Sequence, residues 1–422
     1  MNLRTLFACS LILLGLPLFS QEVKPSFGVS FTGFIRSDLY YDTRQVVAFR
    51  EGNFLMYPEN VVKDAEGNDL NAKSSLNFLA ITTRVRANVT APDALGAKIS
   101  GAIEGEFFGN TEGDINGLRL RHAFVKISWP KTELITGQYW HPMFIPEAAI
   151  IPISFNTGAP FQPITRYPQI RLSHDFARFR LMGMVYTQRD HTSYGPNYAD
   201  PSKPFASGVY LKNAAIPDLH LQLQYRAPAN KVILGAGIDY KTVMPELYTT
   251  GQGGKKYQTN KTLSSWSYFA FAKAVLKPIT IRAGAYMAEN AADMVFIGGY
   301  ACSEITDTVT NAHEWTNLST SSAWLDISNN NPKYKVGLFM GFTKNLGSKD
   351  EINTQIYCSR GKDIDQVMRV SPRFTYLKNK LELSFELEYT AAAYGTPDVH
   401  GRVRDTHTVE NIRPILVTAL NF

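Results

Sequence analysis

The C-terminal end of this chain alternates strictly between two kinds of side chain. Along residues 412–422 every second residue is apolar or tolerated by lipid, and the final residue, Phe422, belongs to that set. A period of two places these side chains on one face of a β-strand. The same alternation recurs from Phe27 onwards, in segments about as long as a bilayer-crossing β-strand. The pattern therefore predicts a transmembrane β-barrel.

The first residues have the features of a secretory signal. Arg4 supplies a positive charge, residues 6–19 form an apolar core, and Ser20 is a small residue before the expected cleavage point. We therefore expect residues 1–20 to be a signal peptide. Residues 21–422 are expected to form one barrel domain in the bacterial outer membrane.

Composition agrees with a barrel that has a wet interior. Aromatic residues make up 12% of the chain, yet the mean hydropathy is only −0.16. Polar residues that face the lumen dilute the lipid-facing ones in such proteins. The net charge of +6 is small and not gathered into runs, so nucleic acid is not an expected partner.

The cysteines indicate neither a metal site nor a firm disulfide. Cys9 lies inside the predicted signal peptide, Cys302 in a predicted loop and Cys358 at a predicted lipid-facing position. We expect Cys302 and Cys358 to remain unpaired, and a disulfide between them is the alternative. Because no metal-binding spacing is found, we expect no metal and no cofactor.

Alternation and turn signals together predict sixteen strands. They are expected at residues 27–42, 74–90, 96–109, 117–130, 133–140, 166–176, 178–190, 218–227, 231–242, 264–277, 279–290, 333–343, 351–360, 364–377, 380–393 and 408–422. Periplasmic turns are short in such barrels and outer loops are long. The predicted short connections are 91–95, 131–132, 177, 228–230, 278, 344–350 and 378–379, and the long ones include 43–73, 141–165, 191–217, 243–263 and 291–332.

One face of each predicted strand is apolar. Lipid-facing sets are Leu79, Ile81, Val85 and Val89; Val232, Leu234, Ala236, Ile238 and Tyr240; Tyr334, Val336, Leu338, Met340 and Phe342; and Leu381, Leu383, Phe385, Leu387 and Tyr389. Aromatic residues near strand ends predict an interfacial girdle formed by Trp129, Tyr139, Trp140, Trp266, Tyr268, Tyr376 and Tyr389. A soluble β-sandwich also alternates, but its strands are usually shorter.

The opposite face collects charge. Predicted lumen-facing residues are Arg84, Arg86, Glu104, Glu106, Arg369, Arg373, Glu382, Glu386 and Glu388. Inward charges at this depth require a wet lumen, and the strand order places acids beside bases, which favours cross-strand pairs. Two interpretations have equal weight: a ladder that stiffens the wall, or a set that selects solutes.

The predicted strand at 117–130 is ambiguous. Arg119 and Arg121 share parity with residues that look lipid-facing, whereas His122 lies on the other side. A β-bulge near His122 would place both arginines in the lumen. Without a bulge they lie near the outer rim.

Residues 141–165, HPMFIPEAAIIPISFNTGAPFQPIT, form an unusually apolar loop. It contains one carboxylate, Glu147, no Lys or Arg, and five prolines that restrict the backbone. Such a loop is a liability when exposed. Folding into the barrel would bury Phe144, Ile145, Ile150, Ile151 and Phe155 and narrow the passage. The alternative is a rigid outer lid or a subunit contact.

The motifs GLRLRHAFVKI (117–127), TGQYWHPMF (136–144), TRYPQIRLSHDF (165–176) and VSPRFTY (370–376), with a terminal aromatic residue, resemble sixteen-stranded Gram-negative porins, most of all the dicarboxylate-type trimeric (DcaP-like) porins. The resemblance implies passive diffusion of small hydrophilic solutes, an inward-folded third loop, homotrimers embedded in outer-membrane lipid and lipopolysaccharide, and a preference for anions. It also implies that Arg119, Arg121, Arg166 and Arg171 line the constriction and face Glu147.

A hydrolase and an adhesin are the two alternative functions. Ser173, His174 and Asp175 are the only nucleophile, base and acid in sequence, but adjacent strand residues point to opposite faces and cannot form a triad together. No motif of a known hydrolase is present, so no enzymatic activity is expected. A non-conducting adhesin or structural barrel is the stronger alternative, and single-channel recording distinguishes it from a porin.

Overall fold

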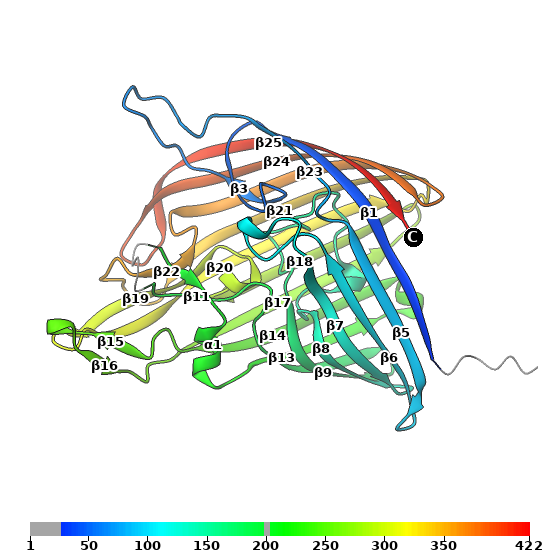
Figure 1. Ribbon diagram of the computed structural model, residues 1–422, viewed down its shortest axis with the longest axis horizontal. Helices are drawn as coiled ribbons and strands as arrows, with labels where there is room; N and C mark the ends of the chain where they lie inside the picture. Colours follow the sequence, from blue (N-terminus) through cyan, green and yellow to red (C-terminus); the bar gives the residue numbers. More distant parts are fainter. Residues whose placement is uncertain (1–26, 198–202) are drawn as a thin grey trace, which may run out of the picture.

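The computed structural model describes residues 27–197 and 203–422. The predicted signal peptide and its cleavage point lie outside the described residues. Within them, antiparallel strands wind into one closed barrel, which Figure 1 shows from the side. No described helix is long and apolar enough to cross a membrane.

Sixteen strand positions form the wall, as predicted. The main sheet contains 19 strands, but β4 and β5 occupy one position, and β19 (Gly298–Asp307) and β22 (Tyr357–Arg360) only extend the sheet beyond it. The wall strands are β1 (Gly28–Asp42), β4 (Ser75–Leu79) with β5 (Arg84–Ala94), β6 (Ala97–Glu106), β7 (Arg119–Ser128), β8 (Thr132–Trp140), β9 (Arg166–Phe176), β10 (Phe179–Tyr186), β13 (Asp218–Arg226), β14 (Val232–Val243), β17 (Leu263–Val275), β18 (Ile279–Glu289), β20 (Ala312–Asn329), β21 (Tyr334–Ser348), β23 (Ile364–Lys378), β24 (Leu381–Pro397) and β25 (Val403–Asn421). The barrel closes where β1 pairs with β25, with Phe34 opposite Asn421.

Connections alternate between short and long. Short turns gather at the end where the C-terminus lies (Figure 1), and we assign this end to the periplasm because periplasmic turns are short in such barrels. The long loops at the other end carry the remaining small elements except η3 (Pro228–Asn230), which lies in the short turn between β13 and β14. These are β2 (Val46–Phe49), β3 (Phe54–Pro58), η1 (Glu112–Asp114), η2 (Pro146–Ala148), β11 (Tyr194–Gly195), β12 (Phe205–Ala206), α1 (Val209–Ala214), β15 (Tyr248–Thr250), η4 (Gln252–Gly254), β16 (Lys256–Gln258) and η5 (Ala292–Met294).

The alternation of the sequence becomes two faces of the wall. On β24, Phe385 and Leu387 are exposed on the outside, whereas Glu386 and Glu388, which alternate with them, are buried inside. The predicted outward sets on β14, β21 and β24 are confirmed by the same pattern of exposure. Hydrocarbon can therefore surround the barrel while charge is kept on its inner face.

One predicted strand was wrong and another was missed. Residues 351–360 contain only the short β22, and the wall strand is β20, which had been predicted to lie in a loop. The outward positions of β20 are Ser319 and Ser321 followed by Ala323, Leu325 and Ile327, and both of its tryptophans, Trp315 and Trp324, are buried. The apolar outer stripe of this strand is therefore short. As a result β21 runs opposite to the prediction, and the connection at 344–350 lies at the long-loop end. Because one predicted strand is missing from the wall and one unpredicted strand is present, β23 again runs in the predicted direction.

The predicted strand at 74–90 is interrupted. Residues 80–83 form a turn between β4 and β5, where the Thr82 hydroxyl donates to Asp38 at 2.6 Å. The turn changes the parity, so Leu76 and Phe78 face outward and Ile81 is buried inside. The predictions that Leu79 and Ile81 face lipid were therefore wrong, because both pack against apolar clusters inside the barrel.

An apolar cluster lies against the inner face of the wall. It joins Phe269, Phe271, Tyr286, Trp324 and Phe339 of β17–β21 to side chains of two long loops, residues 141–165 and 290–297. Phe144, Ile145 and Ile150 of the first loop are buried in it, as expected, whereas Ile151 is 57% exposed.

Candidate functional site

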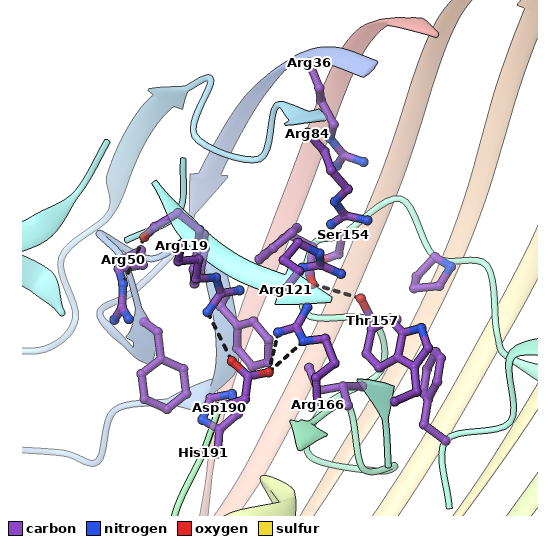
Figure 2. A pocket seen from close by; sticks show the side chains of 18 of the residues that line it. Arg36, Arg50, Arg84, Arg119, Arg121, Ser154, Thr157, Arg166, Asp190 and His191 are labelled. Atoms are coloured by element: carbon purple, nitrogen blue, oxygen red, sulfur yellow. Dashed lines mark hydrogen bonds and ion pairs between the residues drawn. The ribbon is translucent and has the colours of Figure 1, made fainter. Parts of the chain in front are cut away.

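A cavity of about 540 Å³ lies between the inner wall and the long loops, and six arginines line it (Figure 2). They come from four wall strands, β1, β5, β7 and β9, and from the loop between β1 and β4. The ionisable lining residues are Arg36, Arg50, Arg84, Arg119, Arg121, Arg166, Asp190 and His191. The apolar lining includes Trp140, Phe144, Phe108, Phe155 and Ile151, so apolar side chains, most of them aromatic, lie beside the charged groups.

A β-bulge places both arginines of β7 in this cavity. Pairing with β6 shifts register between Leu120 and His122, so Arg121 has no direct partner in the ladder. Arg119 and Arg121 are consequently both buried, and both donate to Glu106, at 2.6 and 2.7 Å. The bulge considered from the sequence is therefore confirmed.

The predicted cross-strand pairs of β5 and β6 are also present. Arg84 lies 2.8 Å from Glu106, and Arg86 lies 3.2 Å from Glu104. Arg121 bridges both carboxylates, because it also contacts Glu104 at 2.7 Å. Two acids thus hold four arginines in a fixed row, in which each guanidinium retains donors for another acceptor.

The acid that faces Arg166 is Asp190, on the loop after β10. Arg166 donates to Asp190 through Nε at 2.9 Å, and Arg119 approaches the same carboxylate at 3.5 Å (Figure 2). Glu147, which was expected here, instead pairs with Arg226 at 3.3 Å and is 42% exposed. Asp190 was not predicted as a site residue, because the predicted strand 178–190 was too long: β10 ends at Tyr186, and Asp190 lies in the loop that follows.

Burial and neighbouring charges set the protonation states of Asp190 and His191. Burial acts to raise the pKa of Asp190, but Arg166 and Arg119 outweigh it and hold that pKa well below its ordinary value. Burial lowers the pKa of His191 to about 3. Asp190 is therefore charged and His191 neutral at pH 7.

Two aromatic residues expected in the interfacial girdle face inward instead. Trp140 lines the cavity, with the guanidinium of Arg166 5.0 Å from its ring centre. Tyr139 packs against Arg171, whose guanidinium lies 5.1 Å from the ring centre. Arg171 does not line the large cavity. It lines a separate space of about 70 Å³ together with Glu147.

Other predicted lumen residues contact the loops or neighbouring wall residues rather than the cavity. Arg369 donates to the carbonyl of Ala159 at 2.7 Å, and Glu386 accepts the backbone N–H of Ser154 at 2.8 Å. Arg373 pairs with Asp326 at 2.6 Å. Glu382 accepts only a hydroxyl of its own strand, that of Ser384. This geometry favours a supporting role for the four residues.

The charges that reach the cavity are unequal. Asp190 is its only carboxylate-bearing lining residue in the described chain, against six arginines. The other acidic partners of these arginines, including Glu104 and Glu106, lie behind them. A low-dielectric wall that presents cations to a water-filled space attracts anions.

The Ser173, His174 and Asp175 run does not assemble into a catalytic triad. His174 contacts Thr132 at 2.9 Å, and Asp175 pairs with Arg180 at 2.6 Å. Ser173 is buried on the opposite face from His174. No group of side chains suited to a metal ion occurs among residues 27–197 and 203–422.

No protein-family model and no curated protein sequence match this chain. Solved structures do. The outer-membrane channel DcaP of Acinetobacter baumannii is 16% identical, covers 94% of this chain and 98% of its own, and has a TM-score of 0.67. An anion-selective porin from Comamonas acidovorans is 12% identical over 94% and 100%, with a TM-score of 0.53. A trimer form of OmpT from Vibrio cholerae is 9% identical over 94% and 100%, also at 0.53. The chain therefore has the fold of a sixteen-stranded outer-membrane porin, as its motifs led us to expect.

Proposed function

We propose that this protein is an outer-membrane porin through which small hydrophilic solutes diffuse passively, with a preference for anions such as small carboxylates. The observation that carries the proposal is the cavity inside a closed barrel, lined by six arginines and one carboxylate. Likeness in fold to DcaP and to an anion-selective porin supports it. Energy coupling is not required, because a concentration gradient is sufficient for diffusion.

The loop at 141–165 is the proposed constriction. Hydrogen bonds from strands around the barrel hold this loop. Arg36 of β1 donates to the carbonyl of Ile153, Ser322 of β20 to that of Phe161, and Arg369 of β23 to that of Ala159. Bonds to β1, β20 and β23 together support a path of this loop across the interior. It would separate the large cavity on one side from the space around Arg171 and Glu147 on the other.

Solutes would cross by successive weak contacts. Guanidinium groups match carboxylates in shape and charge, and a pore requires that none of them binds too tightly. Existing pairs with Glu104, Glu106 and Asp190 moderate four of the six arginines, because part of their charge is already compensated. An anion would therefore pass from Arg166, beside Trp140, to Arg171, on the other side of the loop.

The test is reversal potential across a planar bilayer in a salt gradient. The variant Arg166→Ala/Arg171→Ala should conduct with lower anion selectivity than the wild type. Arg404→Ala, which removes an exposed charge paired with Asp398 away from both cavities, is the matched control. Unchanged reversal potentials in the double variant would remove Arg166 and Arg171 from the account. A wild-type protein without conductance would favour the adhesin alternative.

We further propose a homotrimer that associates through the barrel wall. The most exposed large apolar side chains lie on or beside adjacent strands of the wall: Leu95 between β5 and β6 is 78% exposed, Leu118 before β7 is 70% exposed, and Leu76 and Phe78 on β4 are each 69% exposed. The trimer form of OmpT supports this assembly. Sedimentation in detergent, with the detergent mass matched out, should give three chains per particle, and a single chain per particle would contradict the proposal.

A further inference from the structure

The short turns at the periplasmic end carry an unusually regular set of charges. Six of the seven turns contain one Lys or Arg, and none contains Asp or Glu. The six side chains, which we call the basic ring, are all exposed: Lys131, Arg178, Lys231, Lys277, Lys333 and Lys380. The seventh turn, residues 95–96, is followed directly by exposed Lys98.

These cations lack acidic partners. In the described part of the chain no ion pair involves the basic ring, and the neighbouring acids Glu133 and Asp175 are held by Lys126 and Arg180. Asp93 and the terminal carboxylate of Phe422 are the remaining acids that the described strand ends expose here. The periplasmic end is therefore strongly positive.

The opposite end is mixed in charge. Residues 43–74 alone contain four basic and five acidic side chains: Arg44, Arg50, Lys63 and Lys73, with Glu51, Glu59, Asp64, Glu66 and Asp69. Several of these are paired, such as Arg44 with Asp69 at 3.1 Å. The excess of uncompensated positive charge thus belongs to one end of the barrel.

The basic ring lies at the level where the lipid-facing side chains end. Phe176 and Phe179 flank Arg178 and stack with ring centres 5.9 Å apart, and Leu276 beside Lys277 is 48% exposed. The ammonium of Lys333 lies 5.0 Å from the ring centre of Tyr334. Lysine and arginine next to interfacial apolar residues extend their charge into the head-group region.

We propose that the basic ring binds the phosphate groups of anionic phospholipids in the membrane leaflet that faces the periplasm. The ring follows successive hairpins around the barrel, so its partner has to surround the barrel, as lipid does. A folded protein would contact only one sector. Near an anionic surface each Lys or Arg contributes a preference of about fivefold. The inference rests on the barrel fold and does not depend on conduction.

The test uses the mature protein reconstituted in phosphatidylcholine vesicles with traces of spin-labelled lipid. Electron paramagnetic resonance gives the ratio of association constants for labelled phosphatidylglycerol and phosphatidylcholine at the barrel surface. The wild type should favour phosphatidylglycerol several-fold, and high salt should reduce that preference because the charges are exposed. The salt dependence can be measured on the wild type alone.

A sixfold variant removes the ring: Lys131→Gln, Arg178→Gln, Lys231→Gln, Lys277→Gln, Lys333→Gln and Lys380→Gln. The matched control removes six exposed lysines at the long-loop end: Lys63→Gln, Lys73→Gln, Lys255→Gln, Lys256→Gln, Lys349→Gln and Lys362→Gln. The ratio should fall close to one in the first variant and remain near the wild-type value in the second.

Three outcomes would overturn the proposal. The first is a wild-type ratio close to one. The second is a ring variant that keeps its lipid preference but no longer sediments with peptidoglycan, which would make that polymer the partner. The third is an altered reversal potential with an unchanged lipid ratio, which would assign the ring to the pore mouth.

Discussion

The carboxylate of Glu386 on β24 accepts the backbone N–H of Ser154 at 2.8 Å, and it also accepts the N–H of Ile153. Two successive amides of the 141–165 loop are thus bound to one buried charge of the wall. The Ser371 hydroxyl donates to the other carboxylate oxygen of Glu386. The position of the loop therefore depends on a residue that is 232 positions away in the sequence.

Replacing Glu386 should loosen this segment. In Glu386→Ala both amides lose a charged acceptor, which is worth about 2 kcal/mol for each hydrogen bond, or roughly thirtyfold in local opening. Hydrogen exchange at Ile153 and Ser154 should accelerate accordingly. Glu382→Ala is the control, because Glu382 lies on the same strand and bonds only to Ser384. Equal exchange rates in the two variants would contradict an anchoring role.

Asp190 should limit the anion preference of the cavity. Asp190→Asn removes the carboxylate that compensates Arg166 and Arg119, so the reversal potential should shift towards stronger anion selectivity. Asp64→Asn removes an exposed loop charge outside the cavity and serves as the control. If Asp190→Asn behaved like this control, Asp190 would not face the permeating ions.

The same carboxylate should be insensitive to mild acid. Because the pKa of Asp190 in the folded protein lies well below its ordinary value of 3.8, its contribution to stability is present above that value and is lost only as the pH falls through the lower, folded pKa. The difference in selectivity between wild type and Asp190→Asn should therefore persist from pH 7 to pH 3.8. Convergence of the two proteins at pH 3.8 would show that Arg166 and Arg119 do not hold the charge.

Cys302 and Cys358 should behave as inert thiols. Both are free and buried in one apolar cluster at the long-loop end, and burial raises the pKa of each thiol. Since the thiolate is the reactive form, alkylation of the folded protein should be slow and become complete only after denaturation. Reduction should leave the intact mass unchanged. A mass gain on reduction would instead reveal a disulfide.

The sequence predicted most of the fold because large apolar residues and charges alternate on most strands. On β24, Leu383 and Phe385 alternate with Glu386 and Glu388, and this contrast identifies both faces. Part of the site could also be predicted from alternation along a strand. Arg119 and Arg121 could be placed in the lumen on the condition of a bulge, and the bulge is present.

Residues in loops were harder to predict. The position of Asp190 depends on how the loop after β10 returns to the wall, and no periodicity in residues 187–193 encodes that path. The same reason explains Glu147, which was expected to face Arg119, Arg121 and Arg166 but pairs with Arg226 and shares a space with Arg171 alone of the predicted set. Contacts of this kind arise from tertiary packing, as do the bonds of Arg369 to the carbonyls of Ala159 and Met56.

Strand β20 was missed because its outer face has only a short apolar stripe beside two serines. The direction in which its side chains point can be tested with Trp324. Trp324 is 6% exposed, and its indole N–H donates to the Tyr286 hydroxyl at 3.3 Å on the inner side of the wall. Gly284 on β18 makes room for the ring, since a Cβ there would lie 2.6 Å from it. Trp266, at 42% exposure, faces lipid instead.

Brominated lipids quench only tryptophans that contact acyl chains, so they distinguish the two faces. Trp324→Phe should leave the quenched fraction of the fluorescence unchanged or higher, because an unquenched emitter is removed. Trp266→Phe should lower it, because an accessible emitter is lost. Both substitutions keep an aromatic ring, which limits the cost in packing. The opposite result for Trp324 would reverse the parity of β20 and, with it, the inward assignment of Asp326, which pairs with Arg373 on β23.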